Sequence, residues 1–210
     1  GLKLCAEFAD LQFSTRRTLP SMQAHRAALD AALAQAGRTP RDIGILWSIR
    51  VEVAESDAEY AERERRYLEA VPPDAGLIEM SFQFNVDFSK ARPDMRVADF
   101  AEEVASQKGN LGSFDEIVKT VDPKLTLREF SKRYLLDRVL AATGTPKKIA
   151  DKLEELHHGT GANGGFILAR GFSASDNLKN FVDFVVPELQ RRGLSKKKYS
   201  GRTLRENLNG

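Results

Sequence analysis

Residues 45–53 read ILWSIRVEV and are rich in β-branched and aromatic side chains. Because they follow a proline-containing loop, this composition is typical of a buried strand, which we expect to run from Ile43 to Val53. Ser56 and Glu59 come next at the spacing of a capping box, which predicts a helix directly after the strand. The stretch therefore forms a strand–helix unit, the building block of an α/β fold.

Helix and strand patterns also alternate before this unit. Apolar spacing predicts a helix over residues 2–9 and a short strand over 11–13. Thr18 can cap a second helix, and Gly37 lies just past its end. This order of elements favours parallel strands joined by right-handed helical crossovers, with the helices outside and the strands inside.

The same alternation returns near the C-terminus. Thr145 followed by Pro146 predicts the start of a helix, and residues 165–169 read as a strand. We expect Ser175 to cap the last long helix and Pro187 to kink it.

The middle of the chain is less regular. Pro72, Pro73 and Gly76 end the third helix, and Leu77–Phe88 alternates apolar and polar residues, which predicts an extended segment. Between residues 97 and 140 we expect two or three helices. Two capping boxes mark starts there, Ser113 with Glu116 and Thr126 with Glu129.

The composition excludes several classes of protein. Of the 210 residues 41% are hydrophobic, and 32 basic against 30 acidic side chains give a net charge of +2, as in an ordinary globular protein. This balance argues against nucleic-acid binding. We found neither a membrane-spanning apolar run nor a secretory signal, so we expect a cytoplasmic protein without membrane contact. The single cysteine, Cys5, excludes an intrachain disulfide and a cysteine-rich zinc site.

The histidines and a glycine-rich run favour structural roles. His25 falls on the apolar face of its helix, which favours a packed histidine over a ligand, and we expect no metal site. His157 and His158 close a helix. The run HHGTGANGG, residues 157–165, follows a helix and leads into a strand, the reverse of a phosphate-binding loop, and so predicts a turn. Lys196–Lys198 read as a solvated tail, with an anionic partner as the other option.

If the strands belong to a closed (β/α) barrel, its chemistry lies where the strands end and the next loops begin. Residues 13–16, 47–50 and 169–172 meet this condition and combine aromatic, hydroxyl and guanidinium groups. Such groups can stack on a ring or bind a phosphate, and loop solvation and ordinary packing are the alternative explanation for them. Trp47 and Ser48 can also fall inside the strand.

Several stretches resemble one enzyme family. FVDFVVPELQRRGL (181–194) followed by YSGRTLRENL (199–208) is similar to the C-terminal signature of the flavin-dependent monooxygenases related to nitrilotriacetate monooxygenase component A and dibenzothiophene-sulfone monooxygenase, within the bacterial-luciferase-like superfamily. Residues 1–19, 144–156 and 161–169 resemble, in the right order, a helix leading to the sixth strand, the last-but-one helix and the eighth strand.

The resemblance implies an α/β fold that is the C-terminal part of a (β/α)8 TIM-like barrel. A helical or extended insertion follows the seventh strand. The whole chain, residues 1–210, would then be one partial domain, with the insertion at approximately 72–140. Three strands cannot close a barrel that needs about eight. We therefore expect the first half, upstream of the uncapped helix at Gly1, to come from the same polypeptide or from a second chain.

The resemblance also implies an activity. Members bind reduced FMN supplied by a separate flavin reductase, form a flavin hydroperoxide with O2 and oxygenate a small organic substrate. No catalytic side chain is implied, because the cofactor carries the chemistry. Few of the family's flavin contacts can be carried over residue by residue, because they lie in the first half of the barrel. From the strand-end patches and the start of the chain, the candidates for cofactor contacts are Gly1, Ser14 and Thr15, and those for the substrate pocket are Trp47, Ser48, Arg170 and Phe172. Arg170 could meet an anionic substrate or the flavin phosphate.

Two other functions remain open at this point. The chain could be a non-catalytic flavin-binding or assembly subunit of the same fold, or a helix-rich interaction module that binds no flavin. A homo-oligomer is compatible with each function.

Overall fold

The computed structural model describes the chain apart from residues 73, 89–90, 101–113, 115–117, 119–120, 170, 172–173 and 210. The chain divides into two compact units. Unit 1 comprises Gly1–Ala61 and Val139–Gly210, and unit 2 comprises Glu62–Arg138. Each unit is described by itself.

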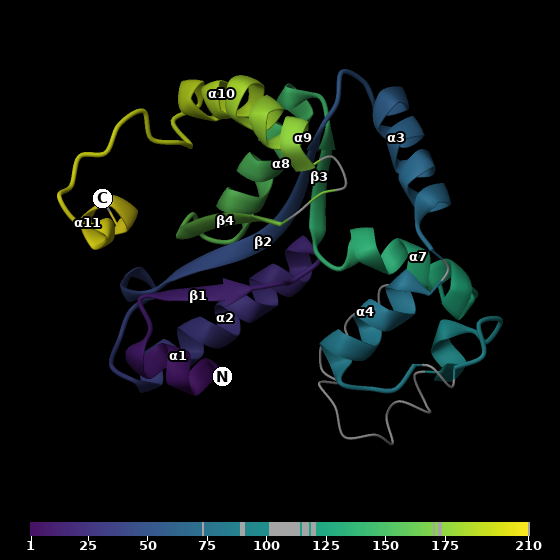
Figure 1. Ribbon diagram of the computed structural model, residues 1–210. Coiled ribbons are helices and arrows are strands. Elements are labelled where there is room, and N and C mark those ends of the chain that lie inside the picture. The colour runs from purple at the N-terminus through teal and green to yellow at the C-terminus, as the bar shows by residue number, and fades with distance from the viewer. Residues whose placement is uncertain are drawn as a thin grey trace. The chain divides into compact units, whose positions relative to one another are not determined.

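Unit 1 contains a parallel four-stranded sheet (Figure 1). Its strands are β1 (Leu11–Ser14), β2 (Gly44–Val53), β3 (Leu140–Gly144) and β4 (Gly164–Ala169). All three neighbours pair with β2 in parallel, which confirms the predicted α/β class with parallel strands. The strand β3 was not predicted, because its five residues LAATG carry little strand signal.

The long strand β2 lies at the centre of the sheet. Residues 45–47 of β2 pair with both β1 and β4, and residues 49–50 pair with both β3 and β4. Since a strand has only two edges, β1 and β3 lie one after the other along one edge and β4 lies along the opposite edge. Every residue of β2 except Leu46 is buried, as the apolar composition of this stretch predicts.

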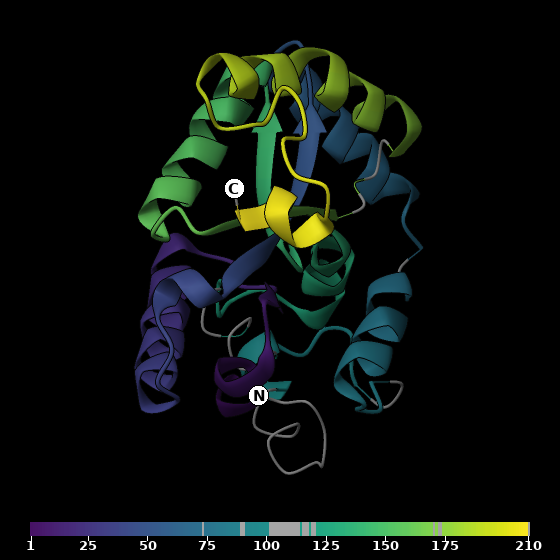
Figure 2. The ribbon, with the colours of Figure 1, turned by 90° about the vertical axis from the view of Figure 1, so that its left-hand side faces the viewer.

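Helices pack against one face of this sheet (Figure 2). They include α1 (Leu2–Phe8), α2 (Leu19–Gln35) and α8 (Pro146–Gly159), and a short 3-10 turn, Pro40–Asp42, precedes β2. The odd-numbered side chains of β2, Trp47 and Ile49 among them, share one apolar core with Leu29 of α2 and Leu153 of α8. We call the side of the sheet that bears these odd-numbered side chains the helix-packed face.

The helix caps predicted at Thr18 and Thr145 are confirmed. The hydroxyl of Thr18 accepts a hydrogen bond from the Ser21 amide at 3.3 Å, and Thr145 accepts one from the Lys148 amide at 3.4 Å. These contacts satisfy amides that have no partner inside the first turn of a helix. Gly37 has φ +71° just beyond α2, a conformation that glycine adopts without strain.

The glycine-rich run after α8 forms a turn, as predicted. Gly164 has φ +110°, and a Cβ at this position would lie 2.0 Å from the carbonyl oxygen of Ile45. Only glycine allows this close approach of β4 to β2. The glycines of this run therefore shape the backbone, consistent with a turn rather than a phosphate-binding loop.

The last long helix is irregular. It consists of α9 (Ala174–Asn180), a π-helical turn (Phe181–Val185) and α10 (Val186–Arg191). The prediction that Ser175 caps it is wrong, because the helix already begins at Ala174. The kink predicted at Pro187 stays a prediction. The π turn contains Asp183, the residue whose carbonyl a proline at 187 displaces, so the proline accounts for this wider turn. A segment of turns and bends then leads to α11 (Leu204–Asn209) (Figures 1 and 2).

Unit 2 is built from helices. They include α4 (Ala75–Phe84) and α7 (Leu127–Asp137), while α3 (Asp57–Ala70) crosses the boundary between the units. The two helices pack closely, because a Cβ at Gly76 would lie 1.7 Å from the carbonyl oxygen of Ser131. The box of Thr126 and Glu129 at the start of α7 is confirmed, with backbone-to-side-chain hydrogen bonds of 3.0 and 3.3 Å. The box predicted at Ser113 and Glu116 lies outside the described residues.

The prediction of an extended segment over Leu77–Phe88 is wrong, because residues up to Phe84 belong to α4. Apolar residues at 80, 82 and 84 suggest a period of two, but only Met80 and Phe84 are buried, and Phe82 is 81% exposed. Their spacing of four residues is the helical period. Ser56 caps α3, because its hydroxyl accepts a hydrogen bond of 3.1 Å from the Glu59 amide, and the Glu59 carboxylate accepts one of 2.7 Å from the Glu55 amide.

None of the helices in the described ranges is both long and apolar enough to span a membrane.

Candidate functional site

The second face of β2 carries polar side chains. Ser48, Arg50 and Glu52 alternate with the apolar residues of the helix-packed face, and side chains alternate between the two faces of a strand. We call the side of the sheet with these three residues the polar face. It approaches the carboxyl end of β2, where the chemistry of parallel α/β folds is found.

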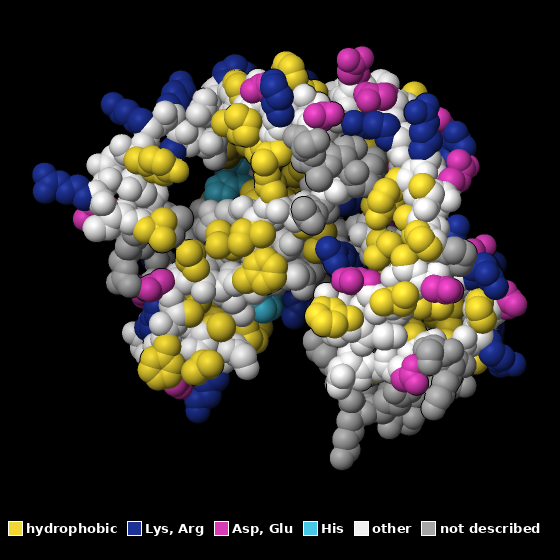
Figure 3. All heavy atoms as spheres, viewed as in Figure 1, with side chains coloured by type: hydrophobic (Ala, Val, Ile, Leu, Met, Phe, Trp, Pro, Cys, Tyr) yellow, Lys and Arg dark blue, Asp and Glu magenta, His cyan; other side chains and the backbone are white. Residues whose placement is uncertain are grey.

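The neighbouring strands place small and apolar side chains on the polar face. Register pairs Arg50 with Ala141 of β3 and Ala169 of β4, so small residues flank the guanidinium on both sides. Further down, Phe13 pairs with Leu46, and Ile167 pairs with Ser48. Phe13 is 56% exposed and Ile167 is 40% exposed. Figure 3 shows hydrophobic side chains gathered over the strands of this unit.

Two opposite charges lie on the polar face. Nη1 of Arg50 is 3.9 Å from Oε1 of Glu52, with side-chain exposures of 3% and 0%. The hydroxyl of Tyr60, at the start of α3, accepts hydrogen bonds of 3.4 Å from both Nη atoms. Two charges removed from water need each other and further hydrogen bonds to be tolerated. These contacts therefore hold the guanidinium in one orientation at the carboxyl end of β2.

Gly171, which follows β4, lies against Glu52. A Cβ at Gly171 would lie 1.8 Å from Oε1 of Glu52, so the backbone of residue 171 lies directly against the carboxylate. Gly171 therefore contributes to the burial of the Glu52 carboxylate.

The predicted cofactor and substrate residues lie in different places. Ser48 lies on the polar face and is 5% exposed. Ser14 and Trp47 pair with each other in register, so both point to the helix-packed face, where Trp47 packs edge-on against His25 with ring centroids 6.0 Å apart. Trp47 and Ser48 lie inside the strand, the option that the sequence left open.

Thr15 is exposed just beyond the end of β1, and Gly1 is exposed at the start of α1. Arg170 and Phe172 lie outside the described residues. The roles assigned to the predicted residues remain predictions.

His25 is packed, as predicted. Its Nε2 lies 3.1 Å from Oε1 of Gln12, and its ring contacts Trp47. These contacts tie α2 to the helix-packed face.

Sequence reasoning missed Glu52 and Tyr60. A usable signal was present for Glu52, because polar residues at 48, 50 and 52 alternate with apolar ones and so indicate one polar face. Tyr60 gave no such signal, since only folding brings the first turn of α3 to the guanidinium of Arg50.

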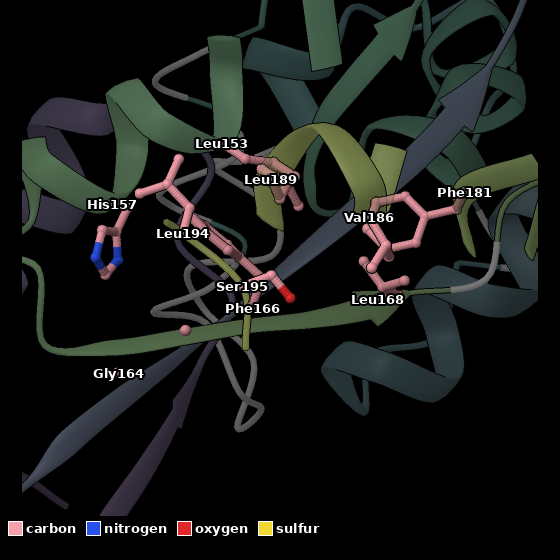
Figure 4. A pocket seen from close by; sticks show the side chains of 11 residues that line it. Leu153, His157, Gly164, Phe166, Leu168, Phe181, Val186, Leu189, Leu194 and Ser195 are labelled. Carbon is pink, nitrogen blue, oxygen red and sulfur yellow. The ribbon is translucent and has the colours of Figure 1, made fainter. Parts of the chain in front are cut away.

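A cavity of about 330 Å³ lies on the helix-packed side of β4, between α8 and α10 (Figure 4). His157 stands at one end, and Phe181, Val186 and Leu168 gather at the other. Burial, and to a smaller extent the neighbouring His158, lowers the pKa of His157. A neutral imidazole suits this mostly apolar cavity.

The chain is similar to known monooxygenases. It is 32% identical to nitrilotriacetate monooxygenase component A of Aminobacter aminovorans and 30% identical to dibenzothiophene-sulfone monooxygenase of Rhodococcus erythropolis, over 99% of this chain and 46% of each relative. The crystal structure of DmoA from Hyphomicrobium sulfonivorans matches all of this chain and 43% of its own, with a TM-score of 0.79 and 25% identity. This chain thus spans about half the length of the curated relatives it matches.

The sequence model of the luciferase-like monooxygenases matches residues 1–164, most of the chain. The parallel sheet with helices packed on one face and a polar opposite face agrees with this match. The chain therefore belongs to the luciferase-like monooxygenase family.

Proposed function

We propose that this chain is part of a reduced-FMN-dependent monooxygenase that uses O2 to oxygenate a small organic substrate. The observation that carries the proposal is the polar face of β2, where buried Ser48, Arg50 and Glu52 approach the carboxyl end of a parallel sheet. The monooxygenase names of the relatives supply the reaction class.

The residues on the polar face fit a flavin. The exposed side chains of Phe13 and Ile167 offer apolar surface to a flat ring, while Ser48 and Arg50 offer hydrogen-bond donors nearby. The reduced flavin, when bound, supplies the electrons and the reaction with oxygen. The chain's own residues hold the ring, orient the substrate and exclude water. The exposed residue Thr15, just beyond the end of β1, is available for the flavin phosphate, together with the predicted contact at Gly1, whereas Ser14 points to the helix-packed face.

We also propose that a separate flavin reductase supplies the reduced cofactor. The name of one relative, nitrilotriacetate monooxygenase component A, describes one component of a larger system, which supports a second protein partner.

We propose further that the sheet continues into a (β/α)8 barrel. Within the described residues β4 pairs with β2 alone, and its Ile167 and Leu168 are each 40% exposed. An unpaired edge beside an apolar cavity favours pairing with further strands. The half of the relatives that this chain does not match can supply those strands, within the same polypeptide or from a second chain. Residues 72–140 would then be an insertion within the barrel.

A titration tests the flavin assignment. The complete protein, with the strands that finish the barrel, is titrated without oxygen with reduced FMN and separately with oxidised FMN. We expect saturable binding of reduced FMN and, once a reductase, NADH and O2 are added, oxygenation of an accepted substrate. Binding without oxygenation of any tested substrate class would favour the non-catalytic subunit, and a folded protein that binds neither form would favour the interaction module.

Two matched variants locate the flavin. Ser48→Ala and Ser14→Ala remove the same hydroxyl from opposite faces of the sheet. We expect Ser48→Ala to weaken FMN binding about five-fold, the effect of losing one hydrogen bond of about 1 kcal/mol. A loss with Ser14→Ala alone would instead support the predicted contact at Ser14 and contradict a flavin on the polar face.

A further inference from the structure

We infer that Asn177 is a positioning residue, whose side-chain amide continues the hydrogen-bond ladder of β2 beyond the end of β4 and thereby holds the backbone at Gly171 against Glu52. The inference rests on the geometry of unit 1. Its second test also rests on the proposed flavin site.

The ladder of β2 alternates between its two edges. The Ile45 amide donates to Asn163, just before β4, whereas the amides of Gly44 and Ala54 donate to the opposite edge, where β1 and β3 lie. Odd-numbered residues of β2 therefore direct their backbone groups toward β4. Since β4 ends at Ala169, opposite Arg50, the next odd residues, Val51 and Val53, extend past its end.

Asn177 takes the place of the missing strand residue. Its Oδ1 accepts a hydrogen bond from the Val53 amide at 2.8 Å, and its Nδ2 donates to the Val51 carbonyl at 2.6 Å. In a parallel ladder one residue of the neighbouring strand makes both of these bonds. Its carbonyl accepts from the amide of one residue, and its amide donates to the carbonyl of the residue two positions earlier in the same strand. A side-chain amide has the same donor and acceptor as a peptide group, so asparagine can substitute for it.

Gly171 lies between two residues that are held on the same edge of β2. Ala169 is held by the β4 ladder, and Asn177 by its two hydrogen bonds to Val51 and Val53, which we call the clamp. Gly171, between them in sequence, lies against the Glu52 carboxylate. Asn177 therefore positions the backbone at Gly171 beside the candidate site without lying on the polar face itself.

The first test needs no flavin. Asn177→Ala removes both hydrogen bonds, and Asn180→Ala makes the same substitution one helical turn further along. In the full chain we expect Asn177→Ala to speed hydrogen exchange at the Val53 amide at least ten-fold relative to the Ile49 amide, which β4 pairing still protects. Equal exchange at Val53 in Asn177→Ala and Asn180→Ala would overturn the inference.

The second test uses FMN as the probe. Asn177→Asp keeps the acceptor for Val53 but places a second oxygen against the Val51 carbonyl, unless that carboxyl is protonated. The pKa of the new carboxyl should therefore be raised, and the clamp should form at low pH and be lost as pH rises through that pKa. We expect the FMN affinity of Asn177→Asp to approach the wild-type value near pH 5 and to fall several-fold by about pH 8. The Asn177→Ala affinity should be weak throughout.

The two tests separate the two proposals. If the wild-type protein binds no FMN, the proposed function fails, and exchange at Val53 still decides the clamp. If the wild-type protein binds FMN and Asn177→Asp shows no pH dependence beyond that of the wild type, the positioning role is contradicted.

Discussion

The guanidinium of Arg50 and the carboxylate of Glu52 lie 3.9 Å apart on one face of β2, and neither side chain is more than 3% exposed. The two residues are two positions apart in one strand, so their side chains point to the same face and lie next to each other. This relationship makes the charge balance of the polar face sensitive to single substitutions.

Removing one charge of this pair should destabilise the fold strongly. Arg50→Met or Glu52→Met leaves its partner as an uncompensated buried charge, and we expect a loss of about 3–5 kcal/mol in the free energy of unfolding. The double variant should be more stable than either single one, because two methionines bury no charge. Urea unfolding of the four proteins measures this coupling.

An exposed pair provides the control. Arg66 and Glu62 lie 2.8 Å apart, with side-chain exposures of 71% and 42%. Water and salt screen such a pair, so Arg66→Met should change the free energy of unfolding far less. Equal losses at Arg50 and Arg66 would contradict the importance of burial.

Two adjacent glycines should respond differently to alanine. At Gly164 the φ of +110° and the carbonyl oxygen of Ile45, 2.0 Å from the new Cβ, predict a loss of at least about 2 kcal/mol on Gly164→Ala. At Gly165 the nearest atom, on Leu46, would be 3.9 Å away, so Gly165→Ala should change stability by less than about 0.5 kcal/mol. Thermal unfolding of the two variants checks the close contact of β4 with β2, and the reverse order of stability would refute it.

Two phenylalanines of α4 distinguish a helix from a strand. Phe84→Ala should cost about 3–5 kcal/mol in the free energy of unfolding, because Phe84 is 1% exposed in the core of unit 2. Phe82→Ala should cost less than about 0.5 kcal/mol, because that ring is 81% exposed. Comparable losses at the two positions would instead support the predicted extended segment, in which both rings lie on the same face.

The stability of the fold should decrease as the pH is lowered, because of His157. Burial lowers the pKa of this imidazole below its ordinary value of 6.5. The unfolded chain then binds the proton more tightly than the folded chain, so stability is full above the unfolded pKa and falls as pH decreases below it. His157→Gln removes this contribution, and the difference in melting temperature between wild type and variant should change between about pH 7 and about pH 5. A constant difference across that range would contradict the pKa shift.

Much of the order of elements in unit 1, apart from β3, and several helix starts could be predicted from sequence because their causes are local. Thr18 and Thr145 cap helices through amides three residues away, and β2 is recognised by its own composition. The prediction of an extended segment over Leu77–Phe88 was wrong because every second residue there is apolar. Such a pattern also repeats every four residues, so it fits the period of a helix as well as that of a strand. Only packing against α7 shows which of those residues is buried.

The candidate site depended on longer-range information. Sequence reasoning placed it at the carboxyl ends of the strands and included Ser48, but it also chose Ser14 and Trp47, which point to the opposite face. A shift of one residue along a strand exchanges its two faces, and strand composition does not determine that register. The resemblance of the C-terminal signature indicated the family, and the family match over residues 1–164 supports that assignment.

By itself the sequence determined an α/β chain of capped helices and parallel strands with a monooxygenase resemblance, because propensity, capping and periodicity act over a few residues. The tertiary structure alone brought the hydroxyl of Tyr60 to Arg50, Gly171 to Glu52, and the amide of Asn177 to the ladder of β2. Asn177 lies 126 positions from Val51 in the chain. No local pattern encodes such a contact, since it forms only when the sheet and the last helix pack together.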